Sequence, residues 1–308
     1  MRPARESSDS RAGLRYGISA YLLWGLFPLY WPLLEPASAL EILAQRMVWS
    51  LVFVALIIWR TRAWRAVRAV FASRDQLTVL SFAACAITIN WATFIWATNN
   101  QHVLEASLGY FITPLVSVLL GVLVLHEALG AVQWAAVGIG TVAIIVLTVN
   151  LGRLPWIALA LALAFGSYGY LKKRAGVGAV ESLAVEASLM ALPALATLSV
   201  LAARGSLAFG HHGAGHAALL ASAGIVTTVP LLLFTAATRR LPLSTVGLIQ
   251  YLEPVLMFAV GVGIRHEPMP AAMWAGFALV WLALVVLSVA GLRASARVRA
   301  RGAPTGQP

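Results

Sequence analysis

The sequence predicts an all-α integral membrane protein with about ten transmembrane helices, arranged as two inverted five-helix repeats. Composition indicates the membrane class, because 60% of the 308 residues are hydrophobic, 11% are charged and the mean hydropathy is +0.85. A soluble chain of this composition would leave large apolar surfaces in water. Long apolar runs recur along the chain, and landmarks of the first half return in the second.

The apolar runs are each roughly 18 to 25 residues long, which as a helix crosses ~30 Å of hydrocarbon. Helices are expected rather than strands, because a helix closes its backbone hydrogen bonds within one segment. The ten expected helices are residues 14–34, 38–59, 76–98, 103–125, 130–150, 154–171, 180–203, 217–238, 243–264 and 270–292. They divide the chain into a cytoplasmic N-terminal segment, two repeats and a basic cytoplasmic tail, at residues 1–13, 14–150, 154–292 and 293–308.

The repeat emerges when the chain is aligned with itself at a shift of 140 positions. His126-Glu127 then falls on His266-Glu267, and Pro114 falls on Pro254. The same shift aligns Glu41 with Glu181, Trp134 with Trp274 and Ala97-Thr98 with Ala237-Thr238. Because five helices per repeat is an odd number, the second repeat must cross the membrane in the opposite direction. Inverted repeats of this kind are typical of secondary transporters.

The basic residues indicate the orientation, because cytoplasmic loops of membrane proteins are rich in lysine and arginine. With the N-terminus inside, the inner segments carry 18 of the 22 such residues. Outer loops hold Arg153, Arg204 and Arg265, while Arg46 lies within a helix. We expect both termini in the cytoplasm. The net charge of +11 follows from this bias and does not indicate a nucleic-acid partner.

The chain carries no P-loop, HExxH or GxSxG motif, and Cys85 is its single cysteine. We therefore expect neither an enzyme nor a bound cofactor or metal. The tract from His211 to His216 is interpreted as a solvated outer linker, because no carboxylate lies near it in the sequence. Each His-Glu pair is interpreted as a helix terminus rather than a catalytic pair.

Ionisable residues inside the apolar runs are the main functional candidates, because each costs about 2.5–3.5 kcal/mol at a helix centre. Glu253 is expected near the midplane, as a coupling group or as a protonated structural acid. Arg46 is expected to pair with Glu105 across the second and fourth helices, as a structural or functional charge pair. Glu41 and Glu181 are expected to reach the headgroups from helix ends.

Aromatic and amide residues beside these charges favour a pocket for organic molecules. Pro114 and Pro254 correspond across the repeat, so a shared kink is predicted in the fourth and ninth helices. Ser107, Gly109 and Gly121 are expected to permit close helix packing. The candidate substrate or coupling residues are Trp24, Arg46, Asn90, Trp91, Glu105, Tyr110, Gln250, Tyr251 and Glu253.

Several sequence blocks resemble a known family. They are EILAQRMVWS, NWATFIWATNN, LEASLGYFITPL and GIVTTVPLLLFTAATRRLPLSTVGLIQYLEP, together with Trp24-Gly25. In this order they resemble the RarD proteins of the EamA branch of the drug/metabolite transporter superfamily, over about residues 14–290. The resemblance implies ten helices in two inverted EamA repeats and a bacterial inner-membrane carrier. The family is associated with chloramphenicol sensitivity. Glu253 departs from the RarD pattern, although Leu252-Glu253-Pro254 is similar to the wider EamA family.

The expected function is secondary transport of small organic metabolites or drugs by alternating access. The alternative is a flippase for a lipid or a lipid-linked sugar on the same scaffold. The expected partners are a small organic solute and membrane lipid, with protons as the candidate coupling ion and a homodimer as the candidate assembly.

The charge distribution predicts that reporter fusions at Leu171 and Arg293 both report the cytoplasm. A periplasmic signal at Arg293 would require an odd number of spans, and the second repeat would then not be inverted.

Overall fold

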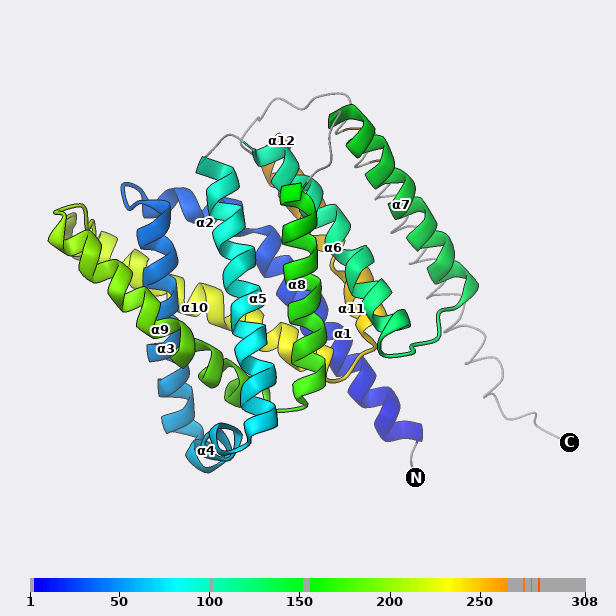
Figure 1. The fold of residues 1–308 in the computed structure, drawn as a ribbon, viewed down its shortest axis with the longest axis horizontal. Helices are drawn as coiled ribbons and strands as arrows, with labels where there is room; N and C mark the ends of the chain where they lie inside the picture. Colours follow the sequence, from blue (N-terminus) through cyan, green and yellow to red (C-terminus); the bar gives the residue numbers. More distant parts are fainter. Residues whose placement is uncertain are drawn as a thin grey trace, which may run out of the picture.

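The computed structural model describes residues 3–99, 102–151 and 156–264, with isolated helical positions at 274, 278 and 282, and the regular structure in this part of the chain is helical (Figure 1). The expected tenth helix, 270–292, otherwise lies outside the described residues. The elements are α1 (Pro3–Gly25), α2 (Phe27–Tyr30), the 3-10 helix η1 (Trp31–Leu34), α3 (Ala39–Thr61), α4 (Trp64–Ala72), α5 (Arg74–Asn99), α6 (Val103–Leu123), α7 (Ala131–Leu151), α8 (Trp156–Ala175), α9 (Ala179–Ala203), α10 (Gly213–Thr238), α11 (Leu243–Ile249) and α12 (Leu252–Gly263).

Nine of the ten expected helices have a counterpart in these elements, and the differences lie at their ends and at two interruptions. α1 begins at Pro3 instead of residue 14. The first expected helix divides after Gly25, and the ninth divides into α11 and α12. Proline lies at the N-terminus of α2 and of η1, where it starts a new turn but cannot continue the hydrogen-bond ladder of the preceding one.

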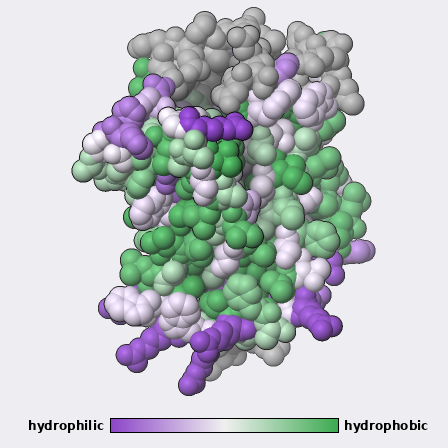
Figure 2. Space-filling model, turned by 60° about the vertical axis from the view of Figure 1, so that its left-hand side comes forward, coloured by the Kyte–Doolittle hydropathy of each residue, from purple (hydrophilic) through white to green (hydrophobic). Residues whose placement is uncertain are grey.

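Five of the described segments are long and apolar enough to cross a membrane: Asp9–Leu34, Ala39–Thr61, Arg74–Ala97, Ala179–Ala203 and Gly213–Thr238. Shorter apolar helical segments span Gly109–Leu123 and Leu243–Met257. On the face drawn in Figure 2, hydrophobic side chains form a broad band across the middle, and hydrophilic side chains gather towards the ends. The chain is a multi-pass membrane protein.

α4 is a helix that the sequence analysis did not predict. It is short and amphipathic: Val67 and Val70 are buried, whereas Arg65 and Arg68 are exposed. The helix has only nine residues and a narrow apolar stripe, so the search for long apolar runs did not predict it. α4 and the N-terminus lie at the same end of the molecule (Figure 1), and an amphipathic helix rich in arginine suits the interface of a membrane.

The two halves of the chain, up to α7 and from α8 onward, interlock instead of forming separate bundles. The most extensive packing joins helices from different halves: α6 with α8, α3 with α9, α5 with α8, α10 with α3 and α1 with α10. Helices within one half, such as α3 and α5, pack far less against each other. Both halves are therefore needed to bury either one.

Small residues allow these interlocked helices to approach closely. A Cβ atom on Gly109 of α6 would lie 2.9 Å from the Leu161 Cβ of α8, which confirms the packing role expected of Gly109. A Cβ on Gly224 of α10 would overlap the backbone of Trp49 on α3. Backbone atoms cannot yield as a flexible side chain can, so the α3–α10 contact depends on glycine at this position.

Gly224→Ala is expected to lower the free energy of unfolding by about 1–3 kcal/mol, the typical cost of overpacking a core. Gly215→Ala in the same helix is the matched control, because a Cβ there meets no atom within 4 Å. Thermal unfolding of the two variants in detergent measures the difference. Equal stability of the two variants would contradict the close approach of α3 and α10.

Candidate functional site

The interruption between α11 and α12 places polar groups inside the bundle. The Glu253 N–H donates to the Gln250 carbonyl at 3.0 Å, a bond between residues three apart, and Pro254 has no N–H to donate. Gln250 and Tyr251 at the interruption are 2% and 1% exposed. Within the described part of the chain, neither the Gln250 side-chain oxygen nor the Tyr251 hydroxyl has a hydrogen-bond partner. Buried polar atoms left unpaired in this way are uncommon and indicate a place for water or ligand.

Glu253 lies in the first turn of α12 and is 8% exposed. Its charge is within interaction range of two tyrosines, Tyr21 on α1 and Tyr110 on α6. The described residues include no ion-pair partner for its carboxyl group. Glu253 is therefore a buried acid near Tyr21 and Tyr110, without a balancing cation among the described residues.

Arg46 on α3 lies between three other elements. Its Nε donates to the Thr227 hydroxyl of α10 at 3.0 Å. Its guanidinium carbon is 4.1 Å from the centroid of the Trp91 ring of α5 and 5.1 Å from that of Trp31 in η1. Tyr110 lies near both Arg46 and Glu253. The structure thus brings together Arg46, Trp91, Tyr110 and Glu253 from the predicted set.

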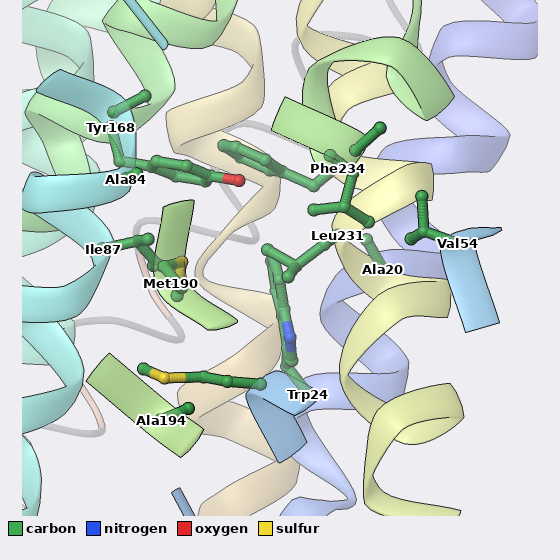
Figure 3. Packing of buried hydrophobic residues seen from close by; sticks show 14 of the residues in the cluster. Ala20, Trp24, Val54, Ala84, Ile87, Tyr168, Met190, Ala194, Leu231 and Phe234 are labelled. Atoms are coloured by element: carbon green, nitrogen blue, oxygen red, sulfur yellow. The ribbon is translucent and has the colours of Figure 1, made fainter. Parts of the chain in front are cut away.

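Asn90 and Trp24 have contacts that hold helices together. The Asn90 amide donates to the Leu161 carbonyl at 2.9 Å, which ties α5 to α8. Trp24 is 8% exposed and packs against Tyr21, Phe165 and Phe234 at ring distances of 5.4, 5.7 and 5.6 Å. Trp24 lies within the hydrophobic cluster close to Phe234, which in turn stacks on Tyr168 (Figure 3).

The Arg46–Glu105 pair remains a prediction, because the Glu105 side chain lies outside the described residues.

Pro114 lies inside α6, which runs without interruption from Val103 to Leu123. Pro254 lies in the first turn of α12, just after the interruption. The two prolines thus occupy different settings in the two helices.

A buried ion pair lies on the side of the aromatic cluster where α8 ends, and the sequence analysis missed it. Lys172 Nζ contacts Glu186 Oε1 and Ser182 Oγ, each at 2.5 Å, and both charged side chains are almost fully buried. The Tyr168 hydroxyl donates to Glu186 Oε2 at 3.0 Å. Lys172 stands next to Lys173 and Arg174, so the sequence alone assigned all three to the positive inner surface. The available signal was Glu186, an acid within an apolar run that needed a cation nearby.

Two glutamates from the first half bind backbone N–H groups of the second half. Glu41 is fully buried and accepts from Ala208 and Phe209 at 2.8 and 2.9 Å, so the expectation that it reaches the headgroups was wrong. Glu127 accepts from the N–H groups of Leu243 and Ser244 at 2.7 and 2.9 Å. These groups begin α11 and have no partner within the helix, so Glu127 caps it.

The two histidine motifs have mainly structural settings. α6 ends at Leu123 before the first His-Glu pair, which confirms that this pair marks a helix terminus. The tract from His211 to His216 was expected to be a linker, but α10 begins at Gly213. The expectation was therefore wrong for residues 213–216, which are helical. His216 Nε2 lies 3.1 Å from the Leu34 carbonyl oxygen and so connects α10 to η1.

Comparison with known proteins identifies the type of fold and the family. The model of the EamA-like transporter family matches residues 11–149 and again 154–289. The chain is 50% identical to the protein RarD of Streptomyces exfoliatus, over 98% of this chain and 96% of that protein. It is 40% identical to an uncharacterized transporter of Pseudomonas aeruginosa, over 95% and 98%. A crystal structure with 18% identity shares the fold, with a TM-score of 0.68 over 93% of this chain and 98% of the other. These matches confirm the resemblance found in the sequence.

The Lys172–Glu186 pair is expected to behave as a coupled unit. Lys172→Met and Glu186→Gln should each lower the free energy of unfolding by about 3–5 kcal/mol, because each leaves an unpaired buried charge. The double variant should lose less than the sum of the two.

The surface pair Arg240–Asp9 provides the control for this cycle. Its side chains are 31% and 62% exposed at a distance of 3.0 Å, and such pairs contribute about 0–1 kcal/mol. Additive losses at Lys172 and Glu186 would show that the two charges do not depend on each other.

The Glu127 contact predicts a pH dependence of stability. Burial raises the pKa of this carboxyl group, but hydrogen bonds from Ser244, Leu243 and Lys173 outweigh burial and lower the pKa below its ordinary value of 4.5. Glu127 therefore stabilises the fold at neutral pH, and this contribution is lost as the pH falls through the lowered pKa.

Denaturation of the wild type and of Glu127→Gln should show a stability difference that is full at neutral pH and shrinks below pH 4.5. A difference that stays constant or grows as the pH falls would contradict the capping role.

Proposed function

The chain belongs to the EamA-like transporter family, and we propose that it is a bacterial inner-membrane secondary transporter of small organic metabolites or drugs that works by alternating access. The observation that carries this proposal is the interrupted helix α11–α12, with Gln250, Tyr251 and Glu253 buried around the interruption. Gln250 and Tyr251 keep helical dihedrals, so the interruption is a local loss of hydrogen bonding before Pro254, of the kind that kinks a helix and leaves carbonyl groups unpaired. Arg46 and its aromatic neighbours supply the remaining polar and stacking groups of the proposed site.

Unequal packing of corresponding helix pairs supports alternating access. Under the shift of 140 residues, α3 and α10 correspond to α9 and α5. α10 packs extensively along α3, whereas α5 contacts α9 much less. If the two halves are inverted, exchanging these two arrangements would close one side of the protein and open the other.

Two charged groups at corresponding positions also differ in their surroundings. Arg46 and Glu186 are 140 positions apart and thus correspond in the repeat. Arg46 is partly exposed, whereas Glu186 is 2% exposed and held by Lys172. Corresponding positions of the two halves therefore have different accessibility, as an exchange between two arrangements requires.

Glu253 is the proposed coupling group. A carboxyl group near the midplane without a cation partner can be protonated from one side and release its proton when water reaches it from the other. Its position next to Gln250, Tyr251 and the interruption would make its protonation sensitive to movement of α12.

A thermal-shift screen of organic solutes on the purified protein, followed by uptake into proteoliposomes, tests the proposed function. A solute that stabilises the protein should be accumulated when a proton gradient is applied. Stabilisation by lipids alone, with no uptake of water-soluble solutes, would favour the flippase.

Glu253→Gln keeps the shape of the side chain and removes its titration, so it is expected to abolish proton-driven accumulation while leaving solute exchange largely intact. Asp75→Asn, which removes an exposed acid at the start of α5, should leave both activities unchanged. Full accumulation by Glu253→Gln would show that Glu253 is a structural acid.

A further inference from the structure

The Arg46 side chain has the surroundings of a ligand-binding cation. Its contacts come from α10, α5 and η1, so its guanidinium group faces the interior of the bundle and not the lipid. The side chain is nevertheless partly exposed. Among the side chains that the structure describes, no carboxylate forms an ion pair with it. A cation in this position costs free energy unless an anion joins it.

The donors of Arg46 are only partly used. A guanidinium group carries five N–H donors along its planar edge, and it stacks on aromatic rings through its face. Trp91 and Trp31 contact it as rings, and the Nε–H donates to Thr227. Within the described residues, the N–H groups of Nη1 and Nη2 make no hydrogen bond. This edge has the geometry that binds a carboxylate through two parallel hydrogen bonds.

The groups around Arg46 fit the body of an organic molecule. Trp31 is held by edge contacts with Phe27 at 5.0 Å and with Tyr30 at 5.3 Å. Trp91 and Tyr110 are also partly exposed, so aromatic faces remain for a ligand next to the free guanidinium edge. Flat aromatic side chains favour a planar or apolar body over a highly hydrated one.

We propose that this transporter carries organic anions, with Arg46 binding the carboxylate of the substrate and Trp31, Trp91 and Tyr110 contacting its planar or apolar body. This inference rests on the proposed function and names its substrate class. A cationic solute would be repelled by Arg46. A neutral amide would leave the guanidinium charge without a counter-ion in a site partly removed from water.

The test compares carboxylates with their own amides, which have nearly the same shape. Binding of benzoate and benzamide, and of phenylacetate and phenylacetamide, is measured by calorimetry on the purified full chain in detergent. Charge-assisted hydrogen bonds exceed neutral ones by about 1 kcal/mol or more, so each acid should bind at least about five- to tenfold more tightly than its amide. Equal binding of acid and amide, or no binding of either acid, would overturn the proposal.

Variants test whether the preference for acids over amides comes from Arg46. Arg46→Gln should abolish the preference for acids, and Arg46→Lys should retain only part of it, because lysine lacks the planar pair of donors. Arg204→Gln, at the exposed C-terminal end of α9, removes one positive charge elsewhere and should change nothing. A preference that survives in a folded Arg46→Gln variant would overturn the proposal, and the wild-type comparison remains decisive if that variant does not fold.

Glu105 provides a further control, because the sequence predicts that it pairs with Arg46. If the substrate carboxylate occupies Arg46, Glu105→Gln should leave the acid preference unchanged. Loss of the acid preference in a folded Glu105→Gln variant would show that the preference does not come from Arg46, and it would overturn the proposal. Uptake of neutral solutes without any acid preference would also overturn it but leave the transporter function intact. Failure to transport any solute would instead count against the proposed function itself.

Discussion

Lipid offers no hydrogen-bonding groups to ionisable side chains, so a charge inside the bundle is costly unless other atoms of the chain satisfy it. Glu41 and Glu127 do so with backbone N–H groups from the opposite half of the chain. Glu186 does so with Lys172, Ser182 and Tyr168. The first two contacts join segments that are more than one hundred residues apart, so satisfying these carboxylates also fixes how the two halves interlock.

Arg46 and Glu253 are the exceptions within the described residues. Each lies among aromatic and polar side chains from several helices, and neither has an oppositely charged partner there. A charged group without a hydrogen-bonded counter-ion is costly in an apolar bundle. Such a group is therefore expected to bind its partner in only part of the functional cycle. A substrate anion at Arg46 and a proton at Glu253 would each supply the missing partner during one part of the transport cycle.

The sequence predicted the features that depend on composition, on the length of apolar runs and on the repeat of 140 residues. It missed the features that depend on three-dimensional contacts. Apolar runs located nine of the ten expected helices, because burial in lipid requires a long apolar stretch wherever a helix crosses. α4 was not predicted, because a short amphipathic helix buries only a narrow apolar stripe, here Val67 and Val70, and needs no long apolar run. The partners of Glu41 and Lys172 could not be predicted, since no local pattern indicates that a loop 167 residues away or a carboxylate 14 residues away will meet the side chain. Arg46, Trp91, Tyr110 and Glu253 were identified as candidates because charged and amphipathic residues are rare in such runs, but Thr227 and Trp31 became visible only in the fold.

Side-specific labelling of a cysteine at Thr227 tests alternating access at the proposed site most directly. Thr227 contacts Arg46 and is 2% exposed, and Cys85, the single native cysteine, is exposed and would first be replaced by alanine. A membrane-impermeant maleimide is then applied to right-side-out and to inside-out vesicles. Alternating access predicts labelling of Thr227→Cys from both sides, with a bound solute changing the balance between them. Labelling from one side only, under every solute and proton gradient, would contradict the account.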